Sequence, residues 1–137
     1  MSDVATMTPS RVRGRIIAVS MAMAFILYLD RICLAEIVKA VSFQQEVALT
    51  KEQIGRVLGV FFFSYALFQV PAGWASDRLG ARPMLTFYIV LWSLFTALTG
   101  MVSTYPALMA MRLLCGVAQA GAYPTSGALI RRWMPLA

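Results

Sequence analysis

Long apolar runs, separated by short polar segments, dominate the chain. Three of these runs carry no charged side chain: Val57–Ser76, Pro83–Met111 and Leu113–Ile130. A helix needs about 20 mostly apolar residues to cross a membrane, so the first run, Ile16–Leu29, must continue through Asp30 and Arg31 to about Val41. Ser103–Pro106 is typical of a turn and divides the longest run. The pattern predicts an all-α integral membrane protein with four transmembrane helices, at about 15–41, 54–77, 83–102 and 105–131.

The composition supports this prediction and disfavours other classes of protein. Hydrophobic residues make up 60% of the chain and charged residues 13%, against about 25% charged in ordinary soluble domains. The net charge of +6 comes from scattered basic residues, without the continuous basic stripe that is typical of nucleic-acid binding. The chain contains no His, which is the commonest metal ligand and general base. We therefore expect no enzyme activity, no catalytic residue, no metal and no cofactor.

Basic residues near the ends of the predicted helices indicate the orientation in the membrane. One side carries seven of them: Arg11, Arg13, Arg15, Arg78, Arg82, Arg131 and Arg132. The other side carries three: Lys39, Lys51 and Arg56. Cytoplasmic segments carry an excess of Lys and Arg, so we expect both termini in the cytoplasm of a multi-pass protein of the cell (inner or plasma) membrane. Residues 1–14 are then a cytoplasmic tail, and Ser42–Gln53 is an external loop.

Charged side chains occur at membrane depth in the first and fourth predicted helices. At 1.5 Å per residue, Asp30 lies about 22 Å above Arg15, and Arg112 lies roughly 28 Å above Arg131. An arginine side chain can cover the difference, so the depths predict an ion pair between Asp30 and Arg112. Such residues usually face the interior of a bundle or a water-filled cavity. The pair can serve function, or it can serve the architecture alone.

A second set of polar residues lies slightly lower in the membrane and suits a ligand. Arg31 and Tyr28 share a face of the first helix because they are three residues apart. Tyr65 and Gln119 lie at about 18 Å in the second and fourth helices. A guanidinium surrounded by Tyr and Gln suits an anionic, hydroxyl-rich solute. These four residues are the predicted binding residues, and packing of a buried polar face is the alternative.

The turn after the second helix resembles a known signature. It reads Gly73-Trp-Ala-Ser-Asp77-Arg78-Leu-Gly80-Ala-Arg82. This segment resembles the cytoplasmic signature loop of the major facilitator superfamily in spacing and in position. The last position of the family pattern is usually basic, whereas this chain has Pro83. The resemblance implies that Gly73, Asp77, Arg78, Gly80 and Arg82 take part in gating.

Two further segments resemble the anion:cation symporter family within that superfamily. They are Tyr28–Arg31 in the first helix and Arg112–Pro124 in the fourth. The resemblance implies transport of an organic anion such as a sugar acid by alternating access, with protons as the coupling ion. It implies that Arg31, Tyr28 and Tyr65 contact the solute and that Asp30 and Arg112 contribute to coupling. The family usually has Glu at the position of Gln119, so proton binding would have to rest on Asp30.

The resemblance also bears on the domain organisation. Members have twelve helices in two halves with the solute between them, so residues 15–137 are expected to form part of the N-terminal half. The chain is then an N-terminal fragment whose partners are the rest of the transporter, membrane lipid, the solute and protons. We expect that it does not transport on its own. A small four-helix protein that works by oligomerising, like a multidrug exporter, and a nonfunctional remnant are the alternatives.

Overall fold

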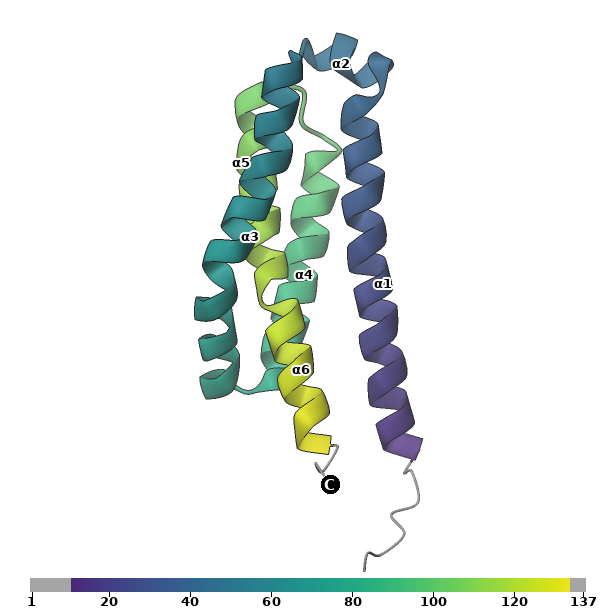
Figure 1. Cartoon of the computed structure of the whole chain (residues 1–137), viewed down its shortest axis with the longest axis vertical. Helices are drawn as coiled ribbons and strands as arrows, with labels where there is room; N and C mark the ends of the chain where they lie inside the picture. The colour runs from purple at the N-terminus through teal and green to yellow at the C-terminus, as the bar shows by residue number, and fades with distance from the viewer. Residues whose placement is uncertain (1–10, 134–137) are drawn as a thin grey trace, which may run out of the picture.

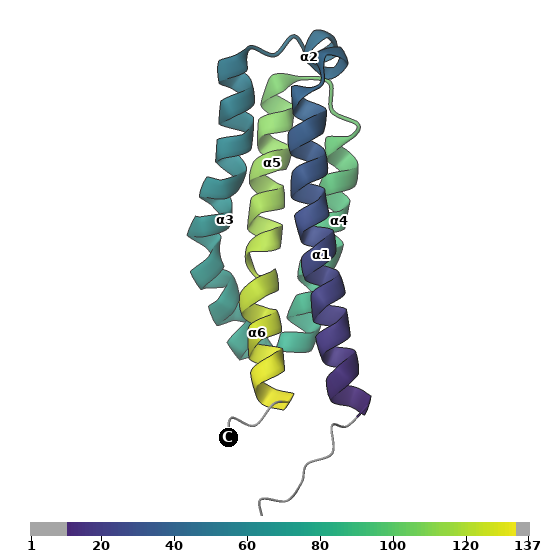
Figure 2. The ribbon, with the colours of Figure 1, turned by 45° about the vertical axis from the view of Figure 1, so that its right-hand side comes forward.

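The structure, a computed structural model that describes residues 11–133, is a bundle of helices (Figure 1). The helices are α1 (Arg11–Lys39), α2 (Val41–Val47), α3 (Lys51–Leu79), α4 (Ala81–Thr99), α5 (Tyr105–Ala120) and α6 (Ala122–Trp133). Figures 1 and 2 show that α1 begins and α6 ends at the same end of the bundle, opposite α2. The predicted all-α fold is confirmed.

Three helices are long and apolar enough to cross a membrane, by length and composition. They are Arg11–Ile37 within α1, Lys51–Leu79 and Ala81–Thr99. The predicted fourth helix is divided, since α5 ends at Ala120 and α6 begins at Ala122. Pro124 explains the break, because proline has no N–H to donate to the carbonyl of Ala120, four residues earlier, and its ring crowds that carbonyl. α5 and α6 nevertheless follow one another along the bundle (Figure 2).

The predicted external loop is shorter than expected, because the helix α2 occupies part of it. Its Phe43 packs against the buried cluster that contains Val57 and Leu108, and such a short helix has too few turns to show a clear apolar period. α3 begins at Lys51, three residues before the predicted start. Thr50 caps it reciprocally with Gln53, each side chain bonding the other residue's backbone N–H.

The predicted cytoplasmic tail, residues 1–14, is shorter than expected. Arg11–Gly14 belong to α1, whereas residues 1–10 lie outside the described part of the chain. The other helix ends differ from the predicted ones by a few residues, which is the usual uncertainty of sequence patterns.

Close packing of α5 on α3 forms the centre of the bundle. A Cβ at Gly116 would lie 2.0 Å from Ser64 Oγ and 2.6 Å from the backbone oxygen of Phe61. Only a glycine allows the two backbones to approach this closely. The approach brings the polar residues of α5 against the aromatic residues of α3.

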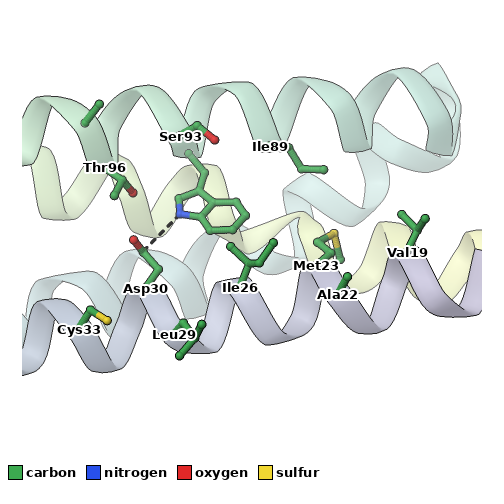
Figure 3. A pocket seen from close by; sticks show the side chains of 12 residues that line it. Val19, Ala22, Met23, Ile26, Leu29, Asp30, Cys33, Ile89, Ser93 and Thr96 are labelled. Atoms are coloured by element: carbon green, nitrogen blue, oxygen red, sulfur yellow. Dashed lines mark hydrogen bonds between the residues drawn. The ribbon is translucent and has the colours of Figure 1, made fainter.

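α1 is held more loosely than the other long helices. It contacts α6 and α2, and it touches α3 only sparsely. A mostly apolar groove of about 770 Å³ separates it from α4, with Met23 and Ile26 on one wall and Ile89 on the other. Asp30 and Thr96 line the same groove (Figure 3). The groove exposes one side of the site described next.

Candidate functional site

Side chains from three helices form one polar group inside the bundle, in which Gln119 lies between Asp30 and Arg31. We call it the charged cluster, and its members are Asp30 and Arg31 from α1, Trp92 from α4, and Arg112 and Gln119 from α5. Phe61 and Tyr65 of α3 cover it with their rings. Residues that are up to 89 positions apart in the sequence thus form a single network.

Asp30 is bound by neutral donors. Its Oδ2 accepts a hydrogen bond from Gln119 Nε2 at 3.0 Å and another from the indole Nε1 of Trp92 at 3.2 Å (Figure 3). The predicted ion pair with Arg112 is wrong, since the two ion pairs of the described residues lie elsewhere and are exposed. The depth estimate placed Asp30 and Arg112 at similar levels, but it carried no information on which side chain lies between them. Gln119 and Trp92 donate hydrogen bonds to the carboxylate instead.

Gln119 connects Asp30 and Arg31, the two members of the charged cluster that belong to α1. Its Oε1 accepts from Arg31 Nε at 3.4 Å, while its Nε2 donates to Asp30. A carboxylate only accepts and a guanidinium only donates, so this arrangement determines the orientation of the amide. Gln119 is 1% exposed, and both ends of its amide are used.

Arg31 has most of its hydrogen-bonding capacity left over. Its guanidinium carbon lies 4.5 Å from the ring centroid of Tyr65 and 5.3 Å from that of Phe61, which places the cation over aromatic faces. Its Nη2 is buried and makes no hydrogen bond within the described part of the chain. Arg31 therefore retains an unused donor inside the bundle.

Arg112 is the most buried charge of the cluster. It is 3% exposed, and its guanidinium carbon lies 4.6 Å from the centroid of Phe61. Its Nε is also buried without a hydrogen-bond partner among residues 11–133. Two guanidinium groups and one carboxylate leave the cluster with a surplus of one positive charge. A buried charge without a paired counter-charge is strongly unfavourable, so the cluster is suited to an added anion.

The two predicted tyrosines differ in position. Tyr65 lies in the site, where its ring stacks on Phe61 and its hydroxyl accepts from Gln69 Nε2 at 3.4 Å. Tyr28, in contrast, is 62% exposed. The three-residue spacing placed Tyr28 near the face of Arg31, but most of the Tyr28 side chain is exposed, whereas Arg31 Nη2 is buried.

The signature loop joins α3 to α4 through a single residue. Gly80 has φ +97°, a conformation that side chains rarely adopt. Arg78 stacks over Trp74 at 4.3 Å, and Asp77 lines a shallow hollow with Arg131 and Arg132 of α6.

The remaining residues of the loop lie beside these. Gly73 faces Pro124 of α6, where a Cβ would meet the proline ring at 3.4 Å. Arg82 is exposed in the first turn of α4. The loop is thus placed against α6, at the end of the bundle opposite α2 (Figure 1).

Nearly the whole sequence, including this loop, matches a known protein family. The pattern described as Major Facilitator Superfamily matches residues 5–137. The chain belongs to this superfamily. It is accordingly part of a multi-pass membrane protein, and its family indicates transport rather than enzyme catalysis.

This superfamily member is similar to several proteins that are named as transporters of organic acids. The chain is 33% identical to a probable sulfoacetate transporter of Cupriavidus necator over 93% of its length, and equally similar over 93% to a D-galactonate transporter of Escherichia coli. A probable galactarate/D-glucarate transporter of Bacillus subtilis is 31% identical over 97% of the chain. These names agree with the resemblance to the anion:cation symporter family. The chain spans 29%, 29% and 31% of the length of these three relatives.

Sequence reasoning missed a second buried polar group in this superfamily member. We call it the hydroxyl cluster, and it consists of Ser76, Tyr88 and Thr125 from α3, α4 and α6. Ser76 Oγ bonds both Thr125 Oγ1 and the backbone oxygen of Ala72, and the hydroxyl of Tyr88 donates to the same oxygen at 2.9 Å. Polar residues within apolar runs were the available signal, but only the packing shows that they meet.

Trp92 was also missed, because an indole in an apolar run indicates packing more readily than a polar contact. As for metals, residues 11–133 contain no group of three or more His, Cys, Asp or Glu side chains that could hold an ion.

Proposed function

We propose that this chain forms part of a transporter that carries a small organic anion, such as a sugar acid, across a cell membrane by alternating access. The relatives named above, which transport acids of this kind, support the proposal. The chain spans under a third of their length, so the proposal concerns a transporter that includes further segments. The distribution of basic residues supports an orientation with both described ends on the cytoplasmic side.

The observation that carries the proposal is the surplus positive charge inside the charged cluster. Arg112 is 3% exposed, and neither it nor Arg31 has a carboxylate partner among the described residues. A carboxylate or sulfonate of a solute would supply the missing counter-charge. Arg31 Nη2 has no partner in the structure, and a guanidinium binds such groups in a forked geometry.

The other predicted binding residues would support this contact. Tyr65 and Gln119 already touch Arg31, and both carry groups that can bond the hydroxyls of a sugar acid. Tyr28 lies one turn before Arg31 and is exposed, so we propose that it contacts the solute from the open side of the cluster. The solute then lies between α1 and segments outside this chain.

We further propose that Asp30 couples transport to protons. It is the one carboxylate of the cluster, and an amide such as Gln119 does not titrate in the physiological range. Protonation of Asp30 would raise the surplus charge of the cluster from one to two and would favour binding of the anion. Arg112 would help to sense this change, and the loop of Gly73, Asp77, Arg78, Gly80 and Arg82 would move against α6 during gating.

Uptake measurements on the whole transporter, reconstituted in proteoliposomes, test the proposal. The solutes are sulfoacetate, D-galactonate, galactarate and D-glucarate, with an inward proton gradient. We expect saturable uptake of at least one of them, and Arg31→Ala should reduce it at least about tenfold because it removes a charge-assisted contact. Arg56→Ala, which removes an exposed arginine paired with Glu52, is the matched control and should transport like the wild type.

Two results would contradict the proposal. One is no uptake of any of these anions by folded protein, and the other is an Arg31→Ala variant that behaves like the control. Proton coupling has a separate test, since Asp30→Asn should remove the dependence of uptake on the proton gradient. Dependence that persists in this variant would exclude Asp30 as the coupling group without affecting the assignment of the anion.

The 137-residue chain by itself is expected not to transport, because one side of its charged cluster is open to the groove between α1 and α4. The alternative is a small four-helix protein that works by oligomerising, and crosslinking of the 137-residue chain in membranes tests it. A discrete oligomer that supports uptake would favour a small self-associating transporter.

A further inference from the structure

Trp92 is the residue through which α4 reaches the charged cluster. Its indole Nε1 donates to Asp30 Oδ2 at 3.2 Å, across the groove between the two helices (Figure 3). Apart from the buried group in which Met23 and Leu27 pack with Trp92, the direct contacts between α1 and α4 are few. This hydrogen bond is therefore a specific link where the packing of the bundle is weakest.

The same carboxylate oxygen accepts from Gln119, and Gln119 accepts from Arg31. The three hydrogen bonds form a series that runs from Trp92 through Asp30 and Gln119 to Arg31. Each link determines the orientation of the next, because the amide can offer its oxygen to Arg31 only while its N–H₂ group faces Asp30. Without the indole, Asp30 is held by Gln119 alone and can turn into the groove.

We propose that Trp92 is a positioning residue: its indole N–H holds the carboxylate of Asp30, which keeps Gln119 and hence Arg31 in the orientation that binds the anion. Trp92 would itself not touch the solute. The effect on anion binding rests on the proposed function, whereas the series of hydrogen bonds does not.

Packing alone is the competing explanation for this residue. Trp92 is 6% exposed and belongs to the buried group that contains Met23, Leu27 and Ala118. A residue that only fills space needs no N–H, and phenylalanine would replace most of its ring. A tryptophan buried here usually needs a partner for its N–H, and that partner is the charged residue Asp30. Trp92→Phe therefore separates the two explanations.

The first experiment measures the hydrogen bond itself on the 137-residue chain in detergent micelles. With ¹⁵N-labelled tryptophan, the chain gives three indole N–H resonances, one for each Trp, which Trp→Phe variants assign. Asp30→Asn replaces a charged acceptor by a weaker neutral one, so it should shift the resonance of Trp92. The resonance of Trp74, which lies over Arg78 in the last turns of α3, should stay in place. An unmoved Trp92 resonance would overturn the proposal whether or not the protein transports anions.

The second experiment measures uptake of D-galactonate, or of whichever tested anion the whole transporter carries. Trp92→Phe should raise KM about fivefold with little change in kcat, because it weakens ground-state and transition-state binding alike. The matched control is Tyr88→Phe, one turn earlier in α4, which removes a buried donor that bonds Ala72 rather than the charged cluster. Tyr88→Phe should leave KM unchanged.

A double variant then tests whether the effect passes through Gln119. Gln119→Leu breaks the series of hydrogen bonds. Adding Trp92→Phe to this variant should therefore change KM less than twofold. If the two residues acted independently, the fold-changes in KM of the single variants would multiply. Two results would overturn the inference: equal KM for Trp92→Phe and Tyr88→Phe, or multiplying effects in the double variant. If the transporter moves no organic anion but the Trp92 resonance responds to Asp30, the proposed function fails and the positioning of Asp30 by Trp92 stands.

Discussion

The two buried polar groups of this bundle are built alike, but they differ in how many of their polar atoms have hydrogen-bond partners. Each joins three helices, and each lies among side chains that are almost completely buried. In the hydroxyl cluster, Ser76, Tyr88 and Thr125 are neutral, and every hydroxyl has a partner. In the charged cluster, Arg31 and Arg112 keep buried nitrogens that have no hydrogen-bond partner among residues 11–133. The comparison teaches that complete pairing is typical of structural contacts, whereas an incomplete, charged network indicates a place for a ligand.

The largest effect is expected at the close approach of α3 and α5, which brings the charged cluster together. Gly116→Leu would place side-chain atoms where Ser64 Oγ and the backbone of Phe61 lie, so α3 and α5 must separate. We expect a loss of about 3 kcal/mol of stability and loss of anion uptake, measured by thermal unfolding in detergent and by proteoliposome assay. Gly59→Leu, which has open space around its Cβ, is the control. Equal unfolding midpoints for the two variants would refute the role of the close approach.

Removal of the unpaired charge should separate stability from function. Arg112→Met retains most of the buried volume and takes away a cation without a counter-charge. We expect stability to stay equal or to rise by about 1–2 kcal/mol, while uptake of the anion is lost. Measurements of unfolding and uptake on the same variant check this. A clearly lower unfolding midpoint would mean that Arg112 stabilises the fold, as the hydroxyl cluster does.

Single and double substitutions in the hydroxyl cluster should give the opposite pattern. Ser76→Ala leaves the hydroxyl of Thr125, which is 0% exposed, without its interhelical partner. The expected loss is about 1 kcal/mol, with KM for the anion unchanged. The double variant Ser76→Ala, Thr125→Val removes both partners and should lose no more than the single variant. Impaired anion binding in either variant would contradict the division into two groups.

The smallest effect is expected for Tyr88→Phe. The backbone oxygen of Ala72 accepts from both Tyr88 and Ser76. After the substitution it still accepts from Ser76. We expect a loss of about 0.5 kcal/mol, detectable as a small shift in the midpoint of thermal unfolding. A larger loss than that of Ser76→Ala would reverse the order of importance within the hydroxyl cluster.

The sequence by itself determined the class of the protein, because membrane insertion depends on the length and apolarity of single segments. Three predicted spans are helices of the right length, and the Gly73–Arg82 loop indicated the superfamily. The charged residues of the cluster were also visible, since charges within apolar runs are few. The depth estimates placed Asp30 and Arg112 close enough to meet and Gln119 slightly lower in the membrane. These properties are local, or they depend only on distance along one helix.

Only the tertiary structure decided which of these side chains bind one another. Depth along a helix does not determine the rotation of the helix about its axis, so the sequence paired Asp30 with Arg112 and did not indicate how far Tyr28 is exposed. The packing instead brings Gln119 and Trp92 to Asp30 and leaves Tyr28 exposed. Hydrogen bonds need partners within about 3 Å and in the right direction. That precision comes from the close approach at Gly116 and from the rotation of α1, α4 and α5 against one another.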